Sequence, residues 1–101
     1  MRRNNERPLF IDIDGTLTCE AGRPWGGVIP ARIAKVITML KRGEQVVIWS
    51  GNGTTYARAF AVANGLTGAV CIGKPEACID DNPDIRPRQA MPVLPPSTLD
   101  D

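Results

Sequence analysis

None of the 101 residues of the chain is a histidine. This absence excludes histidine as a general base, zinc sites with imidazole ligands, and the Ser-His-Asp and Cys-His arrangements of nucleophilic catalysis. Any chemistry must therefore use carboxylates, lysine, hydroxyls, thiols or a metal ion bound through oxygen.

Cysteine is sparse. Cys19, Cys71 and Cys78 are an odd number and show no CxxC spacing. A small secreted protein held together by disulfides would carry an even and denser set. We therefore expect reduced thiols that serve in packing, and a cytoplasmic location.

An excess of one charge and a long apolar run are also missing. Twelve Lys and Arg stand against eleven Asp and Glu, which gives a formal net charge of +1. This balance offers no basic footprint for nucleic acid or for an anionic membrane. No apolar run approaches the length of a membrane span, and the basic residues at 2–3 are followed by polar ones instead of the apolar stretch of a signal peptide. We expect no membrane partner, and nucleic acid is not indicated by charge.

Strand-like apolar runs alternate with helical patterns along the chain. One helix is expected to begin at Pro30 and to end near Gly43. A second is expected to be capped by Thr54 or Thr55 and to end near Gly65. The expected strands are Leu9–Ile13, Val46–Trp49, Ala69–Ile72 and Cys78–Asp80. This alternation predicts a single small α/β domain with a mostly parallel sheet and right-handed crossovers. Residues 15–29 are rich in turn formers and predict an irregular or hairpin excursion. We place the core at 1–82 and a proline-rich tail at 83–101.

Polar residues follow every expected strand. Asp12 and Asp14 end the first, and the later strands end in Ser50, Lys74, and the pair Asp80 and Asp81. The carboxyl ends of parallel strands share one edge of the sheet, where ligands bind. Four separate segments are therefore expected to bring carboxylates, a hydroxyl and an ammonium together.

These residues also carry a family resemblance. The stretch from Asp12 to Leu17 reads DIDGTL, and after an apolar strand it resembles motif I of the haloacid dehalogenase-like (HAD) phosphohydrolases. Ser50 resembles motif II, Lys74 motif III, and Asp80 with Asp81 motif IV. The four occur in the order of the family and span 9–82.

The resemblance implies a reaction. Asp12 would be the nucleophile that forms an aspartyl-phosphate, and Asp14 the acid and base. Phosphate would be bound by Ser50, Gly51, Lys74 and Thr16. Mg²⁺ would be held by Asp12, Asp14, Asp80 and Asp81, a set of oxygen ligands that suits this ion. The expected partner is a small phosphorylated substrate, or an exposed phosphate on a larger one, and oligomerisation is left open.

The resemblance also implies a Rossmann-like, three-layer domain of the minimal type without a cap domain. Its central strand would be Leu9–Ile13, flanked by Val46–Trp49 and Cys78–Asp80. Independently of the resemblance, the excursion places Arg23 and Trp25 as candidates for substrate contact, and Asn52 is a further candidate. Packing into the core is an equal alternative for Trp25.

Simpler interpretations of each motif remain. Asp-Gly and Ser-Gly pairs, and the acidic pair at 80–81, are common in ordinary turns, and a lone lysine is usually solvated. Their joint occurrence at four strand ends argues against such interpretations, and the resemblance then implies a magnesium-dependent phosphomonoester hydrolase. A phosphotransferase, a nucleic-acid end-processing phosphatase, and a weakly catalytic magnesium- or phosphate-binding module that works with a partner are the alternatives.

Overall fold

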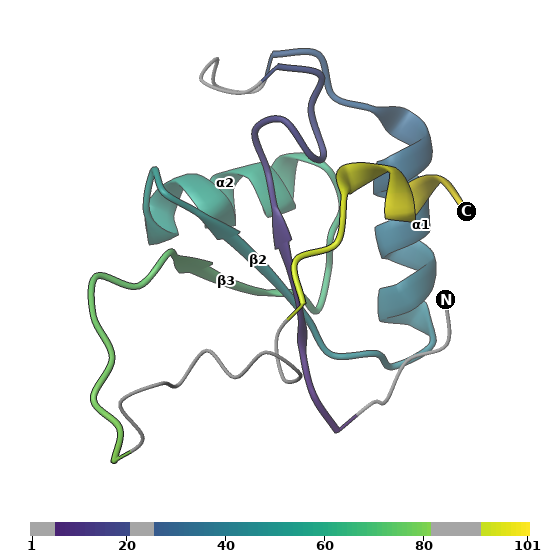
Figure 1. Ribbon diagram of the computed structural model, residues 1–101. Coiled ribbons are helices and arrows are strands. Elements are labelled where there is room, and N and C mark those ends of the chain that lie inside the picture. The colour runs from purple at the N-terminus through teal and green to yellow at the C-terminus, as the bar shows by residue number, and fades with distance from the viewer. Residues whose placement is uncertain (1–5, 21–25, 82–91) are drawn as a thin grey trace.

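The computed structural model describes residues 6–20, 26–81 and 92–101, which form a small α/β unit (Figure 1). Its elements in chain order are β1 (Leu9–Asp12), α1 (Pro30–Lys41), β2 (Val46–Ser50), α2 (Thr54–Ala63), β3 (Val70–Gly73) and the 3-10 helix η1 (Pro96–Asp100). The predicted alternation of strands and helices is confirmed for the first five of these elements.

Helix α1 forms where the sequence predicts it. Pro30 occupies the first turn, where its missing N–H is not needed. Ile33, Val36 and Met39 recur at helical spacing and are buried against the sheet. Gly43 follows the helix with a φ of +79°, a left-handed conformation that glycine adopts without strain.

Helix α2 begins differently from the prediction. The N-cap is Gly53, with a φ of +103°, and no side chain caps the helix. The expectation that Thr54 or Thr55 caps it is therefore wrong. The Thr54 hydroxyl instead accepts a hydrogen bond from the backbone N–H of Gly73, at 2.8 Å. This bond ties the start of α2 to the end of β3.

The three strands form one parallel sheet in the order β1-β2-β3. Asp12 pairs with Trp49, and Ser50 pairs with Gly73. The predicted parallel sheet is thus confirmed, but β2 is its central strand and β1 lies at an edge. The expectation of a central first strand is wrong for the described residues.

The fourth expected strand is also absent from the described part of the chain. Cys78–Asp80 has no regular structure, and the Ile79 side chain is fully exposed. Only three apolar residues, Ala77 to Ile79, separate polar ones here, so the segment has little hydrophobic surface to bury as a strand. It leaves the end of β3 and extends away from the carboxyl ends of the strands (Figure 1, green).

Both helices cover the same face of the sheet. Ile11 and Ile48 belong to one buried cluster with residues of α1 and α2, whereas Phe10 and Trp49 alternate to the opposite face. Successive right-handed crossovers that move in one direction place their helices on one side. The described residues therefore form two layers, and the expected third layer is not found among them.

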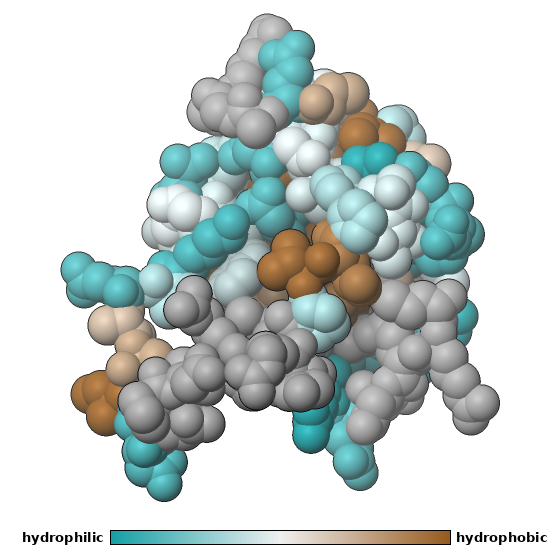
Figure 2. Space-filling view, viewed as in Figure 1, coloured by the Kyte–Doolittle hydropathy of each residue, from teal (hydrophilic) through white to brown (hydrophobic). Residues whose placement is uncertain are grey.

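The C-terminal segment packs on this core. Leu99 of η1 is 8% exposed and belongs to the buried cluster, and η1 lies beside α1. Arg32 of α1 forms two hydrogen bonds of 2.8 Å with the Asp100 carboxylate. Val93 and Leu94, which precede η1, are among the large hydrophobic side chains that are exposed. Figure 2 shows that the hydrophobic surface on this face is confined to a few places.

The excursion between β1 and α1 is a short hairpin in its described part. Thr18 and Val28 form an antiparallel bridge, and the Cys19 N–H donates to the Gly27 carbonyl at 2.8 Å. Of the two predicted alternatives, an irregular excursion or a hairpin, the structure supports the hairpin.

Within the described ranges, no helix is long and apolar enough to cross a bilayer.

Candidate active site

The loop that follows Asp12 and carries Asp14 is held at its base by backbone hydrogen bonds. The Ile13 carbonyl accepts hydrogen bonds from the N–H groups of Thr16, Leu17 and Thr18, at 2.8–3.1 Å. Gly15 has a φ of +86°, which supplies the tight exit from the strand. Because Leu17 and Thr18 are buried, the loop is anchored on the core.

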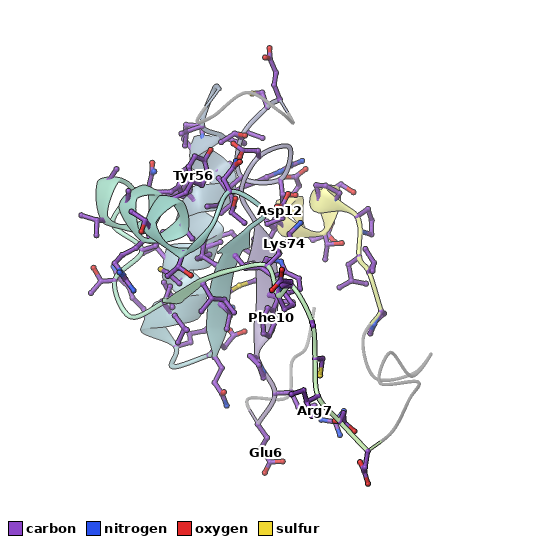
Figure 3. All side chains as sticks on the ribbon, turned by 90° about the vertical axis from the view of Figure 1, so that its left-hand side faces the viewer. Glu6, Arg7, Phe10, Asp12, Tyr56 and Lys74 are labelled. Atoms are coloured by element: carbon purple, nitrogen blue, oxygen red, sulfur yellow. The ribbon has the colours of Figure 1, made fainter. Side chains whose placement is uncertain are left out.

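Asp12 and Lys74 meet at the carboxyl ends of β1 and β3. The Lys74 ammonium lies 3.3 Å from Asp12 Oδ1, and the Thr16 hydroxyl donates to Asp12 Oδ2 at 3.3 Å. Figure 3 shows the Asp12 and Lys74 side chains adjacent at this edge. Their side chains are 33% and 44% exposed, so the pair is open to a ligand. The structure thus brings together two of the four segments that were expected to converge.

Lys74 is also placed by an aromatic ring. Its ammonium lies 5.7 Å from the centroid of the Trp49 ring, within the range of a cation–π contact. The Trp49 ring packs edge-on against Phe10, with 4.6 Å between ring centroids. The backbone N–H of Lys74 donates to the Ser50 carbonyl at 2.9 Å. Contacts of the Lys74 backbone and of its side chain therefore both fix the position of the ammonium.

Asp14 has a separate set of partners. The Tyr56 hydroxyl lies 2.8 Å from both oxygens of the Asp14 carboxylate, and the Asn52 side-chain amide donates to Oδ2 at 3.2 Å. Asn52, expected to contact substrate, is thus brought to the site through Asp14. Asp12 faces a cation and a hydroxyl, whereas these two partners of Asp14 are neutral donors.

Tyr56 is the site residue that the sequence reasoning missed. Its place among the apolar positions of α2 indicated core packing, and the ring does pack against the buried cluster. The signal was its position in the first turn after the polar end of β2, where a side chain lies near the carboxyl edge of the sheet.

The two expected phosphate ligands at motif II, Ser50 and Gly51, differ in their exposure. Ser50 is 3% exposed, and its Oγ accepts a hydrogen bond from the Asn52 N–H at 3.0 Å. Gly51 is exposed, with open space where a side chain would be. The surface available to a phosphate here belongs mainly to the Gly51 backbone, and Ser50 shapes the turn that presents it.

Asp80 and Asp81 lie on the exposed segment that extends away from this edge, so the structure does not bring them to Asp12 (Figures 1 and 3). Within the part of the chain that the structure describes, no three Asp, Glu, Cys or His side chains cluster as a metal site would require. Asp12 and Asp14 alone do not make up the expected magnesium site. The described residues therefore do not assemble the expected set of ligands.

The other expected substrate contacts, Arg23 and Trp25, lie outside the described residues. Of the cysteines, Cys71 packs against the core, and burial raises the pKa of its thiol, which favours the protonated form. This agrees with a packing role.

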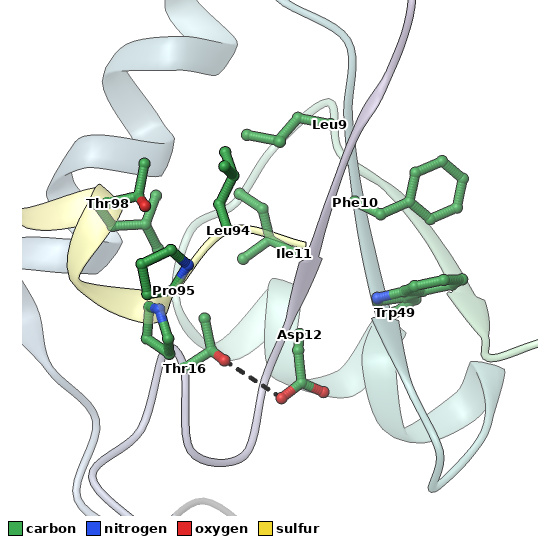
Figure 4. Close-up of a pocket in the computed structure, with 11 residues that line it drawn as sticks. Leu9, Phe10, Ile11, Asp12, Thr16, Trp49, Leu94, Pro95 and Thr98 are labelled. Atoms are coloured by element: carbon green, nitrogen blue, oxygen red, sulfur yellow. Dashed lines mark hydrogen bonds between the residues drawn. The ribbon is translucent and has the colours of Figure 1, made fainter. Parts of the chain in front are cut away.

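A cavity of about 130 Å³ lies along the free edge of β1, between that strand and the C-terminal segment (Figure 4). Asp12 and Thr16 are at one end, and the rest of the lining is mainly apolar, with Leu9, Ile11 and Leu94 among it. Asp14 and Tyr56 do not line it. The cavity therefore touches only one of the two acidic residues.

Comparison with known proteins found no relative of this chain. No family model, no curated protein and no solved structure matches it at a significant level. The functional argument therefore depends on the chemistry of the site.

Proposed function

We propose that the protein is a phosphomonoester hydrolase of the HAD-like type that works through an aspartyl-phosphate. The observation that carries the proposal is the Asp12–Lys74 pair, with Asp14 held separately two residues further along the chain. A nucleophilic carboxylate beside a fixed cation, and a second carboxylate held by hydrogen bonds from Tyr56 and Asn52, are the two groups that this reaction needs.

In the first step, an oxygen of the Asp12 carboxylate attacks phosphorus. A bond forms between that oxygen and phosphorus, the bond to the leaving oxygen breaks, and the proton of a protonated Asp14 passes to the leaving oxygen. In the second step, water attacks the phosphorus of the aspartyl-phosphate while Asp14 takes up its proton. The Asp12 carboxylate is restored and inorganic phosphate leaves.

Lys74 and the Gly51 backbone stabilise the negative charge of the transferring group. Fixed donors and cations aimed at phosphoryl oxygens are the main source of catalysis in such reactions. Lys74 is suited to this because its ammonium is already held between Asp12 and Trp49. The leaving group must face Asp14, so the cavity along β1 is not assigned to it.

No step is assigned to a metal ion, because the described residues do not assemble a site for one. The requirement for Mg²⁺ stays a prediction from the sequence. A reducing compartment such as the cytoplasm is part of the proposal, since all three cysteines are free.

A phosphatase screen tests the proposal. Sugar phosphates, nucleotides, aryl phosphates and DNA ends carrying phosphate are offered with and without Mg²⁺, and phosphate release is measured. We expect turnover of at least one class that is lost in Asp12→Asn. Binding of phosphate by the wild-type protein without turnover on any class would contradict the enzyme and favour the binding-module alternative.

A further inference from the structure

We infer that Tyr56 is a positioning residue, which fixes the Asp14 side chain for proton transfer to the leaving group. The inference rests on the proposed function and adds a residue that the family motifs do not include. Its basis is the contact of one hydroxyl with both oxygens of the Asp14 carboxylate, each at 2.8 Å.

Tyr56 is itself held firmly. Its ring is partly buried against the core, between helix α2 and the loop after β1. Tyrosine has only two side-chain torsions, so a packed ring leaves its hydroxyl little freedom. Figure 3 shows Tyr56, on α2, on the opposite side of Asp12 from the C-terminal segment.

Asp14 needs such support more than Asp12 does. The backbone of its loop is fixed by the Ile13 carbonyl, but a carboxylate on a loop still has side-chain rotation to lose. Tyr56 supplies a hydrogen bond against this rotation, and Asn52 adds a longer one, at 3.2 Å. Both donors come from the turn and helix that follow β2, so this part of the chain orients a carboxylate on the loop after β1.

The equal distances to both oxygens suit a group that changes protonation. A single hydroxyl proton serves one oxygen at a time. When Asp14 is a carboxylate, Tyr56 can donate to either oxygen. When Asp14 is protonated, Tyr56 donates to the oxygen without the proton, and the protonated oxygen is left for the leaving group. The contact therefore persists through both steps of the proposed reaction.

The test uses Tyr56→Phe, which removes the hydroxyl and keeps the ring. For an alkyl phosphate, whose leaving oxygen needs a proton, we expect kcat/KM to fall by about 10-fold to 100-fold, the scale of a misplaced catalytic group. For 4-nitrophenyl phosphate, whose leaving group departs as the anion, kcat/KM should fall by less than about threefold. Thr55→Ala, at an exposed position in the same turn, is the matched control and should leave both values unchanged.

A double-mutant cycle separates positioning from a structural role. If Tyr56 acts through Asp14, adding Tyr56→Phe to Asp14→Asn should cause no further loss with the alkyl phosphate. Equal losses on both substrates, a further loss in the double variant, or no loss at all would overturn the inference alone. A wild-type protein inactive on every phosphate ester would overturn the proposed function, and this inference with it.

Discussion

Arg32 joins Asp100 across 68 positions of the sequence through two hydrogen bonds of 2.8 Å. The same guanidinium donates to the Thr16 carbonyl at 2.9 Å. One side chain of α1 therefore links the C-terminal turn to the loop that carries Asp14. Leu99, buried next to Asp100, adds a hydrophobic anchor to the same turn.

This pair predicts a pH dependence of stability. The hydrogen bonds from Arg32 hold the pKa of Asp100 below its ordinary value of 3.8. Folding therefore favours the charged carboxylate. The stabilisation is complete above 3.8 and is lost as the pH falls through the lowered pKa of the folded state. Asp100→Asn should have a lower Tm than the wild type at neutral pH, and the difference should vanish in strong acid.

Thermal unfolding across a pH series measures this difference. Asp101→Asn, which removes a neighbouring carboxylate outside the Arg32 pair, is the matched control. A Tm difference for Asp100→Asn that stays constant down to strong acid would show that the ion pair is not its cause.

Gly73→Ala should loosen the junction between β3 and α2. A Cβ at this position would lie 3.0 Å from the Gly53 Cα and 3.2 Å from the Thr54 backbone N, and neither atom belongs to a flexible side chain. Overpacking of this kind costs about 1–3 kcal/mol. Chemical denaturation measures the free energy of unfolding. Gly51→Ala is the control, because open space surrounds that position, and equal stability of the two variants would contradict the packing described.

Asp14→Asn should slow turnover of an alkyl phosphate by about 10²–10⁴-fold, the usual contribution of general acid–base catalysis. The amide keeps the shape of the side chain and can still accept a hydrogen bond from Tyr56, so the Tm should change little. Steady-state kinetics with an unchanged rate would remove Asp14 from the mechanism.

Removal of divalent ions tests the magnesium prediction. We expect a chelator to abolish turnover and Mg²⁺ to restore it. Asp80→Asn is the informative variant, because this residue lies on the segment that extends away from Asp12. An unchanged Mg²⁺ concentration dependence in Asp80→Asn would remove Asp80 from the expected ligand set. Full activity in the chelator would contradict the metal requirement itself.

Local patterns in the sequence were enough to predict α1, α2 and the three strands, but not the 3-10 helix η1 in the proline-rich tail. Each depends on residues close together in the chain, as Pro30 and Gly43 do for α1. The meeting of Asp12 and Lys74 was predictable too, because parallel strands bring their carboxyl ends to one edge. The strand order was not predictable in this way, since apolar runs do not specify which edge of β1 is paired.

Two features of the site depend on tertiary contacts that no spacing reveals. Tyr56 stands at a helical position typical of packing residues, and only the fold brings its hydroxyl to Asp14. Ser50 follows a strand as a ligand would, yet the turn into α2 buries it. The prediction of a strand at Cys78–Asp80 was wrong for a different reason, because the apolar run there is too short to favour a strand.

The most direct test of the central claim is a single-turnover reaction with a radiolabelled phosphate ester, quenched in acid before the intermediate is hydrolysed. The account predicts a labelled phosphoryl group on the peptide that contains Asp12, and no label in Asp12→Asn. Turnover by the wild-type protein with no label on this peptide at any quench time, or full turnover by Asp12→Asn, would contradict it.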